Sequence, residues 1–269
     1  MKKVIERITL FIVCSILFTA CNRMDIDTEN GNQHAVPEIK VVLSDFTGSA
    51  DTRTQESSYQ TSFTGNEQIG VFALKSSGNV VVGNNIPYEY DVSTGTWAPV
   101  NASDKVYVYD SGVTYYAYYP YSSTMNNKKS IAEISAAFIP QKNQSSYADY
   151  TASDLMCGAG TLSGNNLSFT FTHAMFLVEI EINETSSSSL PAAPNPVFHG
   201  INPWPMEAGK TYRYITRPAV AVEVGCEYGP EDNRYAFRHT LAADAVTAGN
   251  YIHLNASFTS TRTKAGALN

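Results

Sequence analysis

The sequence predicts an all-β protein, and three observations support this prediction. Tyrosine and phenylalanine, which are enriched in strands, occur 17 and 12 times in 269 residues. Short runs of alternating apolar and polar residues recur along the chain, separated by turns rich in Gly, Asn and Ser. Apolar residues rarely recur at the spacing of 3.6 residues that marks an amphipathic helix. We therefore expect strands joined by polar turns, with little helix.

The N-terminal 20 residues have the features of a secretory signal peptide. Three basic side chains come first, and the apolar run ITLFIVCSILF (8–18) follows them. Because a membrane-spanning helix needs about 20 apolar residues, this shorter run is not expected to cross a bilayer. The small residues Thr19 and Ala20 close the segment, as expected before a cleavage site.

Cys21 follows directly after Ala20, and this arrangement resembles the lipobox of bacterial lipoproteins, although Phe18 stands where that motif usually has Leu. The resemblance implies cleavage between Ala20 and Cys21, acylation of Cys21, and export through the periplasm to the outer membrane. Several acyl chains, each contributing about 0.8 kcal/mol per buried methylene, would hold the protein there. Residues 21–37 are polar and lack periodicity, so we expect a flexible tether.

Charge and cysteine content narrow the possible functions. Without residues 1–20 the chain carries 15 basic and 24 acidic side chains, a net charge of −9. Nucleic-acid binding needs a basic surface, so this balance argues against it. Beyond Cys21 the chain has Cys157 and Cys226. They could pair in an oxidising compartment or stay as two separate buried thiols, and we favour separate thiols.

Strand-like segments follow one another through the first half of the chain. They are 38–46, 68–74, 79–83, 87–91, 96–100, 106–110 and 113–121. The first alternates Ile39, Val41 and Leu43 toward one face, and the second is apolar on both faces, as in a central strand. Gly95 suits a hairpin turn between the fourth and fifth segments, and Gly112 suits one between the last two.

The last of these segments contains the run YYAYYPY, with five tyrosines in seven positions. In a strand, side chains alternate between faces, so Tyr115, Tyr119 and Tyr121 lie on one face. Tyr116 and Tyr118 lie on the other. A stacking platform for sugars or bases would place its rings on one face. We therefore favour packing inside a sheet over ligand binding for this run.

The polar segment at 122–137 is expected to form at most one helical turn, around Ile131 and Ile134. The longest predicted strand pair is LSFTFTHAMFLVEIEI (167–182). Its apolar residues change parity near Ala174, which predicts a bulge or a break. His173 ends an apolar face, and we favour a core or edge histidine over a metal ligand, because no second ligand stands at a recognisable spacing. The proline-rich residues 197–218 are left unassigned. The last predicted strands are 219–225, 233–239 and 249–258.

The sequence lacks motifs for catalysis or cofactor binding. It contains no HExxH, CxxC or GxSxG motif and no glycine-rich phosphate loop, and its five histidines are scattered. We therefore expect no enzyme activity, no cofactor and no metal site.

The order of several motifs resembles the fimbrillin-like family of the Bacteroidales, whose members are subunits and accessory proteins of type V pili. In chain order these motifs are TRT (52–54), GNEQIGVFA (65–73), YDVSTGTW (90–97), YYAYYPY (115–121), DLM (154–156) and FTFTHAMFLVEIEI (169–182). Their order and spacing carry the resemblance, since no single motif is specific. The family implies two tandem transthyretin-like β-sandwich domains, which we expect at residues 38–163 and 164–269.

The resemblance also implies a structural or adhesive component of cell-surface fimbriae whose partners are other fimbrial subunits. In that family an Arg-specific protease cuts the loop after the first strand, and a neighbouring subunit's strand replaces the strand that leaves. The matching bond is Arg53–Thr54, and removing the first strand would leave an apolar groove with unpaired ladders on both flanks. Arg53 could also be an ordinary solvated loop charge. The alternative function is a surface lipoprotein that binds glycan or a host ligand and never polymerises.

Overall fold

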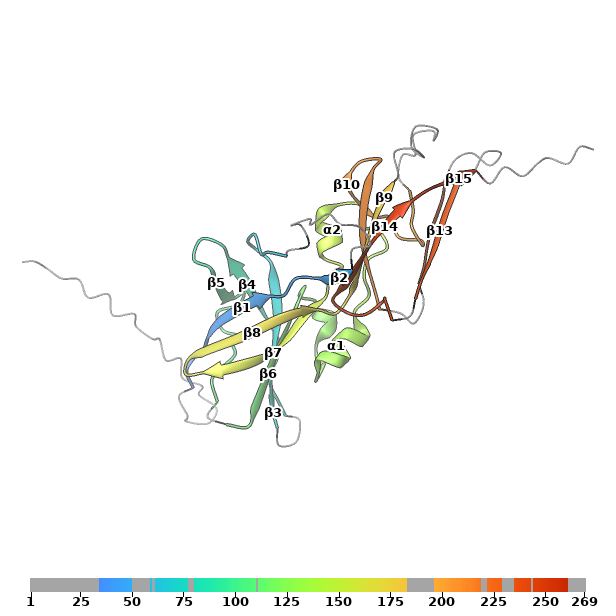
Figure 1. The fold of residues 1–269 in the computed structure, drawn as a ribbon. Coiled ribbons are helices and arrows are strands. Elements are labelled where there is room, and N and C mark those ends of the chain that lie inside the picture. The colour runs from blue at the N-terminus through green and yellow to red at the C-terminus, as the bar shows by residue number, and fades with distance from the viewer. Residues whose placement is uncertain are drawn as a thin grey trace, which may run out of the picture.

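The computed structural model describes residues 34–49, 59, 61–76, 80–109, 111–182, 196–218, 222–228, 235–242 and 244–260. The predicted lipid-attachment and cleavage residues Ala20, Cys21, Arg53 and Thr54 lie outside these ranges. The described part is mostly strand, arranged in three sheets with short helices between the first two (Figure 1). Sheets pack face to face around apolar cores. The predicted all-β class with sandwich-like sheets is therefore confirmed.

The first sheet has seven strands in the order β1-β8-β7-β6-β3-β4-β5. Its strands are β1 (Glu38–Leu43), β3 (Gln68–Lys75), β4 (Val80–Asp91), β5 (Thr96–Pro99), β6 (Val113–Tyr119), β7 (Met156–Ser163) and β8 (Asn166–His173). Neighbouring strands are antiparallel except for β1 and β8, which run parallel. The sheet curls, so that its two edge strands, β1 and β5, come close to each other.

Two predicted hairpins of this sheet have different outcomes. The β4–β5 hairpin is present, and Gly95 takes a positive φ of 69° in its turn. The hairpin predicted between residues 106–110 and β6 is wrong, because residues 106–109 form no strand. Tyrosine hydroxyls accept hydrogen bonds from this backbone instead. Val106 N donates to Tyr88 Oη (2.9 Å), and Tyr109 N donates to Tyr115 Oη (3.2 Å). β6 pairs with β3 and β7.

The tyrosine run lies in the middle of the first sheet, on β6. Tyr115, Tyr116 and Tyr118 are 3%, 4% and 0% exposed, and they enter the cores on the two opposite faces of the sheet. Packing inside the molecule is therefore confirmed for these three rings. Tyr119 and Tyr121, at the exit of the strand, are only partly buried and border a cleft described below.

Two short α-helices lie between the first and second sheets (Figure 1). They are α1 (Ile131–Ala137) and α2 (Tyr147–Thr151), and the 3-10 helix η1 (Ser123–Met125) precedes them. The side chains of Ser130 and Ser146 cap the two α-helices by accepting hydrogen bonds from backbone amides of the first turn. α1 buries Ile134 and α2 buries Tyr150 in a core shared by both sheets. α1 has seven residues, about two turns, so the prediction of at most one helical turn at this place is too low.

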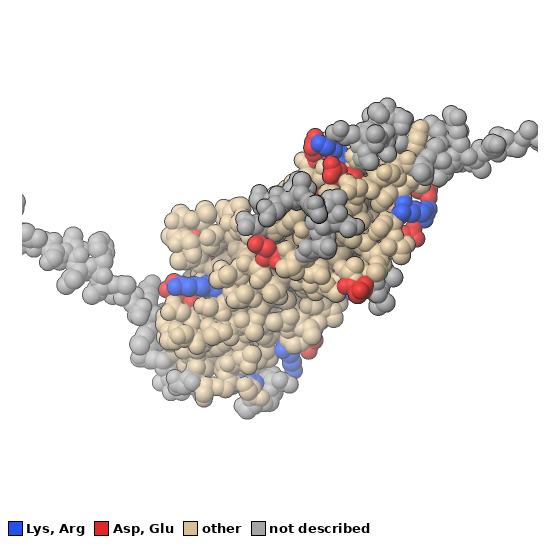
Figure 2. All heavy atoms as spheres, viewed as in Figure 1, with Lys and Arg blue, Asp and Glu red and all other residues tan. Residues whose placement is uncertain are grey.

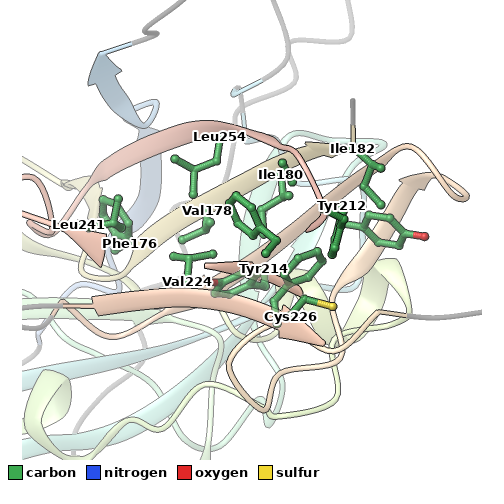
Figure 3. Close-up of a cluster of buried hydrophobic side chains, with 14 of the residues drawn as sticks. Phe176, Val178, Ile180, Ile182, Tyr212, Tyr214, Val224, Cys226, Leu241 and Leu254 are labelled. Atoms are coloured by element: carbon green, nitrogen blue, oxygen red, sulfur yellow. The ribbon is translucent and has the colours of Figure 1, made fainter. Parts of the chain in front are cut away.

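The second sheet has the order β10-β11-β9-β14-β2, and the third has the order β12-β13-β15. Their strands are β2 (Thr47–Ser49), β9 (Phe176–Ile182), β10 (Trp204–Glu207), β11 (Thr211–Thr216), β12 (Val222–Tyr228), β13 (Tyr235–Leu241), β14 (Asn250–Ala256) and β15 (Thr259–Ser260). The two sheets enclose an apolar core that includes Val178, Tyr214 and Cys226 (Figure 3). The segment 197–218, which the sequence left unassigned, supplies β10 and β11.

The chain passes from the first sheet to the second between β8 and β9. β8 forms a hairpin with β7, and its Leu167, Phe169 and Phe171 belong to the core of the first sheet. β9 pairs with β11 and β14 in the second sheet. The break predicted near Ala174 is therefore confirmed as a change of sheet. This change of sheet lies C-terminal to the domain boundary that we expected between residues 163 and 164.

Cys157 and Cys226 are buried free thiols in separate apolar cores. The favoured prediction of two separate thiols is confirmed, and burial raises the pKa of each thiol to about 11. Within the described ranges, no helix is long and apolar enough to span a membrane. The same residues contain no cluster of three or more His, Cys, Asp or Glu side chains that could hold a metal ion.

Candidate functional site: the N-terminal segment and the adjoining cleft

The N-terminal segment, residues 34–49, joins the first sheet to the second. Its strand β1 runs along the edge of the first sheet in register with β8. Ile39 is 2% exposed, Val41 and Leu43 are partly buried, and Val42 on the opposite face is 61% exposed. The alternation predicted for this strand is therefore confirmed.

Within the described residues, β1 pairs with a strand on one side only. Its ladder is with β8, extended by hydrogen bonds from Glu38 N to Asn165 O (2.8 Å) and from Ser44 N to Phe171 O (2.9 Å). The expectation of unpaired ladders on both flanks is therefore wrong. Because β1 is an edge strand, its removal would free one ladder, that of β8.

After β1 the segment crosses to the second sheet, where β2 adds a second edge strand. β2 runs parallel to β14, with Thr47 in register with Asn250. Thr47 N donates to Gly249 O (2.8 Å), and its hydroxyl donates to Asn250 Oδ1 (3.0 Å). Figure 1 shows β2 leading from the first sheet to β14. One short segment therefore contributes an edge strand to each of two sheets.

The crossing point is held by an aromatic contact between Phe46 and His173. Phe46 is 7% exposed, and its ring stacks on the imidazole with centroids 3.6 Å apart. His173 Nδ1 lies 2.8 Å and 3.0 Å from the two carboxylate oxygens of Asp154. Burial raises the pKa of Asp154, while the hydrogen bond and charge of His173 act to lower it. Of the predicted alternatives, a core or an edge histidine, the structure shows a core histidine, 3% exposed. Asp154 orients its ring against Phe46.

Tyr59 is the next described residue after β2, and the second sheet holds its side chain. Its hydroxyl donates to Glu179 Oε1 (3.2 Å), and its ring stacks on Tyr251 with centroids 3.9 Å apart. The guanidinium of Arg213 lies over the same ring, 4.5 Å from its centroid. Three strands of the second sheet, β9, β11 and β14, therefore hold this one side chain. Arg53 lies between β2 and Tyr59 in sequence, outside the described residues.

Glu179 is the centre of a buried charge cluster on the second sheet. Its side chain is 3% exposed and accepts hydrogen bonds from Arg213 Nε and from His253 Nδ1 (2.7 Å). Burial acts to raise the pKa of Glu179, but the hydrogen bonds and charges of His253 and Arg213 outweigh it, so the pKa is lowered. Glu179 therefore stays ionised and holds Arg213 and His253 in place.

A cleft with a volume of about 650 Å³ lies beside the N-terminal segment, between the first and second sheets. Aromatic rings from several separate parts of the chain line it, namely Phe46, Tyr59, Phe63, Tyr119, Tyr121, Tyr147, Tyr150 and Trp204. Charged lining residues are Glu67, Asp154 and Arg213, and Gln68, Asn66 and Thr151 add neutral polar groups. The size falls within the range typical of small-molecule sites, about 300–1,000 Å³.

Several residues of this region were not singled out from the sequence. Glu179 and Arg213 come from different parts of the second sheet and meet through the pairing of β9 with β11. A glutamate inside the apolar strand FLVEIEI is the one local signal that could have drawn attention to this cluster. Asp154 and His173 stand in two of the quoted motifs, DLM and FTFTHAMFLVEIEI, and their contact gives those motifs a shared structural role.

Comparisons with known proteins agree with the sandwich-like fold. A crystal structure of a fimbrial protein from Bacteroides ovatus matches 83% of this chain and 49% of that one, with a TM-score of 0.55 and 23% identity. A candidate cell adhesion protein from the same species matches 86% of this chain and 97% of its own, with a TM-score of 0.54 and 13% identity. At such identities the likeness shows the fold alone.

Sequence comparison defines the family. The profile of the fimbrillin-like family matches residues 52–203, which is more than half of the chain. This protein therefore belongs to the fimbrillin-like family. A candidate fimbrium tip subunit of Bacteroides ovatus, Fim1C, is 34% identical over 145 residues. That match covers 50% of this chain and 26% of Fim1C, so the chain spans about a quarter of this curated relative.

Proposed function

We propose that this protein is a structural and adhesive component of cell-surface fimbriae that assembles with other subunits by strand exchange. Membership of the fimbrillin-like family supports the fimbrial role, as does the likeness to Fim1C. One observation carries the assembly step: residues 34–49 supply an edge strand to each of two sheets. The proposed role is mechanical and needs neither a catalytic residue nor a cofactor.

The position of the predicted cleavage site supports this mechanism. Arg53 lies four residues after Ser49 and six before Tyr59 in the sequence. A cut after Arg53 would separate the segment that carries β1, Phe46 and β2 from Tyr59, which is held by the second sheet. Departure of the segment would free the edges of β8 and β14 together. An extended strand of another subunit with the same apolar alternation could then bind there by β-augmentation.

We further propose that Cys21 carries the lipid anchor that delivers the subunit to the outer membrane, after export through the periplasm and cleavage between Ala20 and Cys21. Two tandem domains remain part of the proposal. The change of sheet at Ala174 supports a boundary there, since β8 packs in the core of the first sheet and β9 in that of the second.

The assembly step is tested by cutting the detergent-solubilised protein with an Arg-specific protease. We expect a new N-terminus at Thr54 and multimers that resist SDS. Arg53→Lys is the matched variant, because it keeps the charge and a trypsin site but removes the Arg-specific site. This variant should form multimers after trypsin and remain monomeric with the Arg-specific protease. Wild-type protein that is cut at Thr54 and stays monomeric would contradict strand exchange.

The cleft favours a second candidate function, a surface protein that binds a ligand and does not polymerise. Its aromatic lining and its volume of about 650 Å³ are the observations that support ligand binding. The two functions are separable, because the Arg53→Lys variant should bind ligand normally while it fails to assemble with the Arg-specific protease.

A further inference from the structure

The cleft between the first and second sheets has walls that are fixed before any ligand arrives. Trp204 of β10 packs against Tyr147 and Tyr150 of α2, with ring centroids 5.0 Å apart in both pairs. Elsewhere in the lining, Glu67 accepts hydrogen bonds from Thr64 N and its hydroxyl (both 2.8 Å) and from Gly65 N (2.7 Å). A preformed wall reduces the entropy lost on binding.

The mouth of the cleft exposes side chains that a protein usually buries. Tyr147 is 58% exposed and Met206 is 36% exposed, and both border the cleft. Among the exposed large apolar residues in the described part of the chain, Tyr147 is the one aromatic ring. The exposed part of this ring does not contribute to the packing of the core. The accessible ring of Tyr147 therefore offers its face to a ligand next to partly buried Trp204, whose ring is tilted by 59° against it.

The charges in the cleft favour a neutral ligand. Arg213 is ion-paired with Glu179, and Asp154 is hydrogen-bonded to His173 Nδ1, so these groups already have partners inside the protein. Glu67 is held by uncharged donors; burial acts to raise its pKa, but hydrogen bonds from Thr64 and Gly65 outweigh it and lower the pKa. Glu67 is therefore ionised at neutral pH and would repel an anionic ligand such as a phosphate or an acidic sugar.

The remaining lining combines aromatic faces with neutral hydrogen-bonding groups. The amides of Asn66 and Gln68 and the hydroxyl of Thr151 lie in the same cleft as the rings. A pyranose ring presents an apolar C–H face for stacking and hydroxyls at its edge for hydrogen bonds. Gln68 Nε2 already donates to Glu89 Oε2 (2.8 Å), and the Thr151 hydroxyl donates to Tyr147 O (3.0 Å), so these two side chains offer a ligand mainly their acceptor oxygens. Sugar hydroxyls can donate to such oxygens, whereas an apolar peptide side chain cannot.

We infer that this cleft binds a neutral sugar residue, stacked on Tyr147 and Trp204 and hydrogen-bonded by the neutral polar side chains Asn66, Gln68 and Thr151 that line it. The inference goes beyond the assembly role and does not depend on it. Tyr147, Trp204 and Glu67 lie outside the segment that strand exchange would remove, and Phe46 is the one described lining residue inside that segment. It gives the adhesive part of the proposed function a location and a ligand class.

The test is a binding titration of the full-length, detergent-solubilised protein against a defined panel of oligosaccharides. The panel contains neutral trisaccharides of glucose, galactose, mannose and N-acetylglucosamine, their sialylated and sulfated counterparts, and a Trp-containing tripeptide. We expect at least one neutral trisaccharide to bind. Tyr147→Ala should weaken that binding by about tenfold, the loss expected for one stacking contact. Trp204→Phe should weaken it less, because a smaller ring remains.

Ile139→Ala is the matched control, because Ile139 is 77% exposed and does not line the cleft. It should bind the sugar as the wild type does. Equal binding by Tyr147→Ala and the wild type would show that the sugar does not bind in this cleft. Failure of all neutral trisaccharides, stronger binding of the acidic counterparts, or preference for the tripeptide would overturn the ligand class. The Arg53→Lys assembly assay is unaffected by any of these results, so failure of the two proposals can be told apart.

Discussion

Replacing Phe46 by alanine tests whether the N-terminal segment is held at the joint between the sheets. Phe46 is 7% exposed and stacks on His173 with ring centroids 3.6 Å apart. Truncating a buried phenylalanine costs about 3–5 kcal/mol. Because Phe46 also borders the cleft, where neighbouring groups can relax, we expect a value near 3 kcal/mol. Because about 1.4 kcal/mol corresponds to a factor of ten, the equilibrium constant for docking of the N-terminal segment should fall about 100-fold.

Hydrogen exchange measured by mass spectrometry can locate this loss. Amides of β1 and β2 should exchange about 100 times faster in Phe46→Ala, because local opening exposes them without unfolding the sheets. Amides of β3 and β6, at the centre of the first sheet, should keep the wild-type rates. Val42→Ala is the control, since Val42 lies on the same segment, is 61% exposed, and should change stability by less than about 0.5 kcal/mol.

Two results would refute this reasoning. Unchanged exchange in β1 and β2 would mean that Phe46 does not hold the segment. Uniformly faster exchange throughout the first sheet would mean that the segment is not a separately releasable unit.

Three further predictions concern packing, charge and anchoring. Tyr118→Ala removes a ring that is 0% exposed and whose hydroxyl is 2.8 Å from Asn85 Oδ1, so the free energy of unfolding in urea should fall by about 3–5 kcal/mol; an unchanged urea midpoint would contradict the packing role. Because the pKa of Glu179 is lowered from its ordinary 4.5, its contribution is present above pH 4.5 and is lost as the pH falls below it. Glu179→Gln should therefore have a lower free energy of unfolding than the wild type at pH 7. Between pH 5 and pH 3 its free energy of unfolding should fall by less than that of the wild type. Parallel plots of the free energy of unfolding against pH would exclude this role. Cys21→Ser should leave the membrane fraction or retain its uncleaved signal, and a variant of mature mass that stays in that fraction would exclude the lipid anchor.

Local features of the fold could be predicted because their physical cause lies within a few residues. The alternation of Tyr115, Tyr116 and Tyr118 between two faces follows from the period of two in a strand. The turn at Gly95 follows from the need for a positive φ. Ala174 marks a parity change that any extended chain must resolve by a bulge or a break.

Non-local features could not be predicted from one sequence. Strand-like alternation continues on both sides of the parity change between Leu167 and Ile182, which also fits a bulge within one sheet, so the pattern does not reveal that β8 and β9 belong to different sheets. β2 is a short polar stretch inside a predicted loop, and it becomes a strand only because β14 offers a free edge. The contact of Glu179 with Arg213, and the cleft itself, depend on how distant segments meet.

The central claim is that β1 must leave its place beside β8 before subunits can join. Lys40 and Ser168 are exposed register partners on these parallel strands, which are about 4.8 Å apart, so cysteines at both positions can form a disulfide. We would cut the oxidised double variant, Lys40→Cys with Ser168→Cys, after Arg53 and follow its size by gel filtration. The account predicts monomers while the disulfide is closed and multimers once a reductant opens it. Equal multimer formation by the oxidised and the reduced protein would contradict strand exchange at β8.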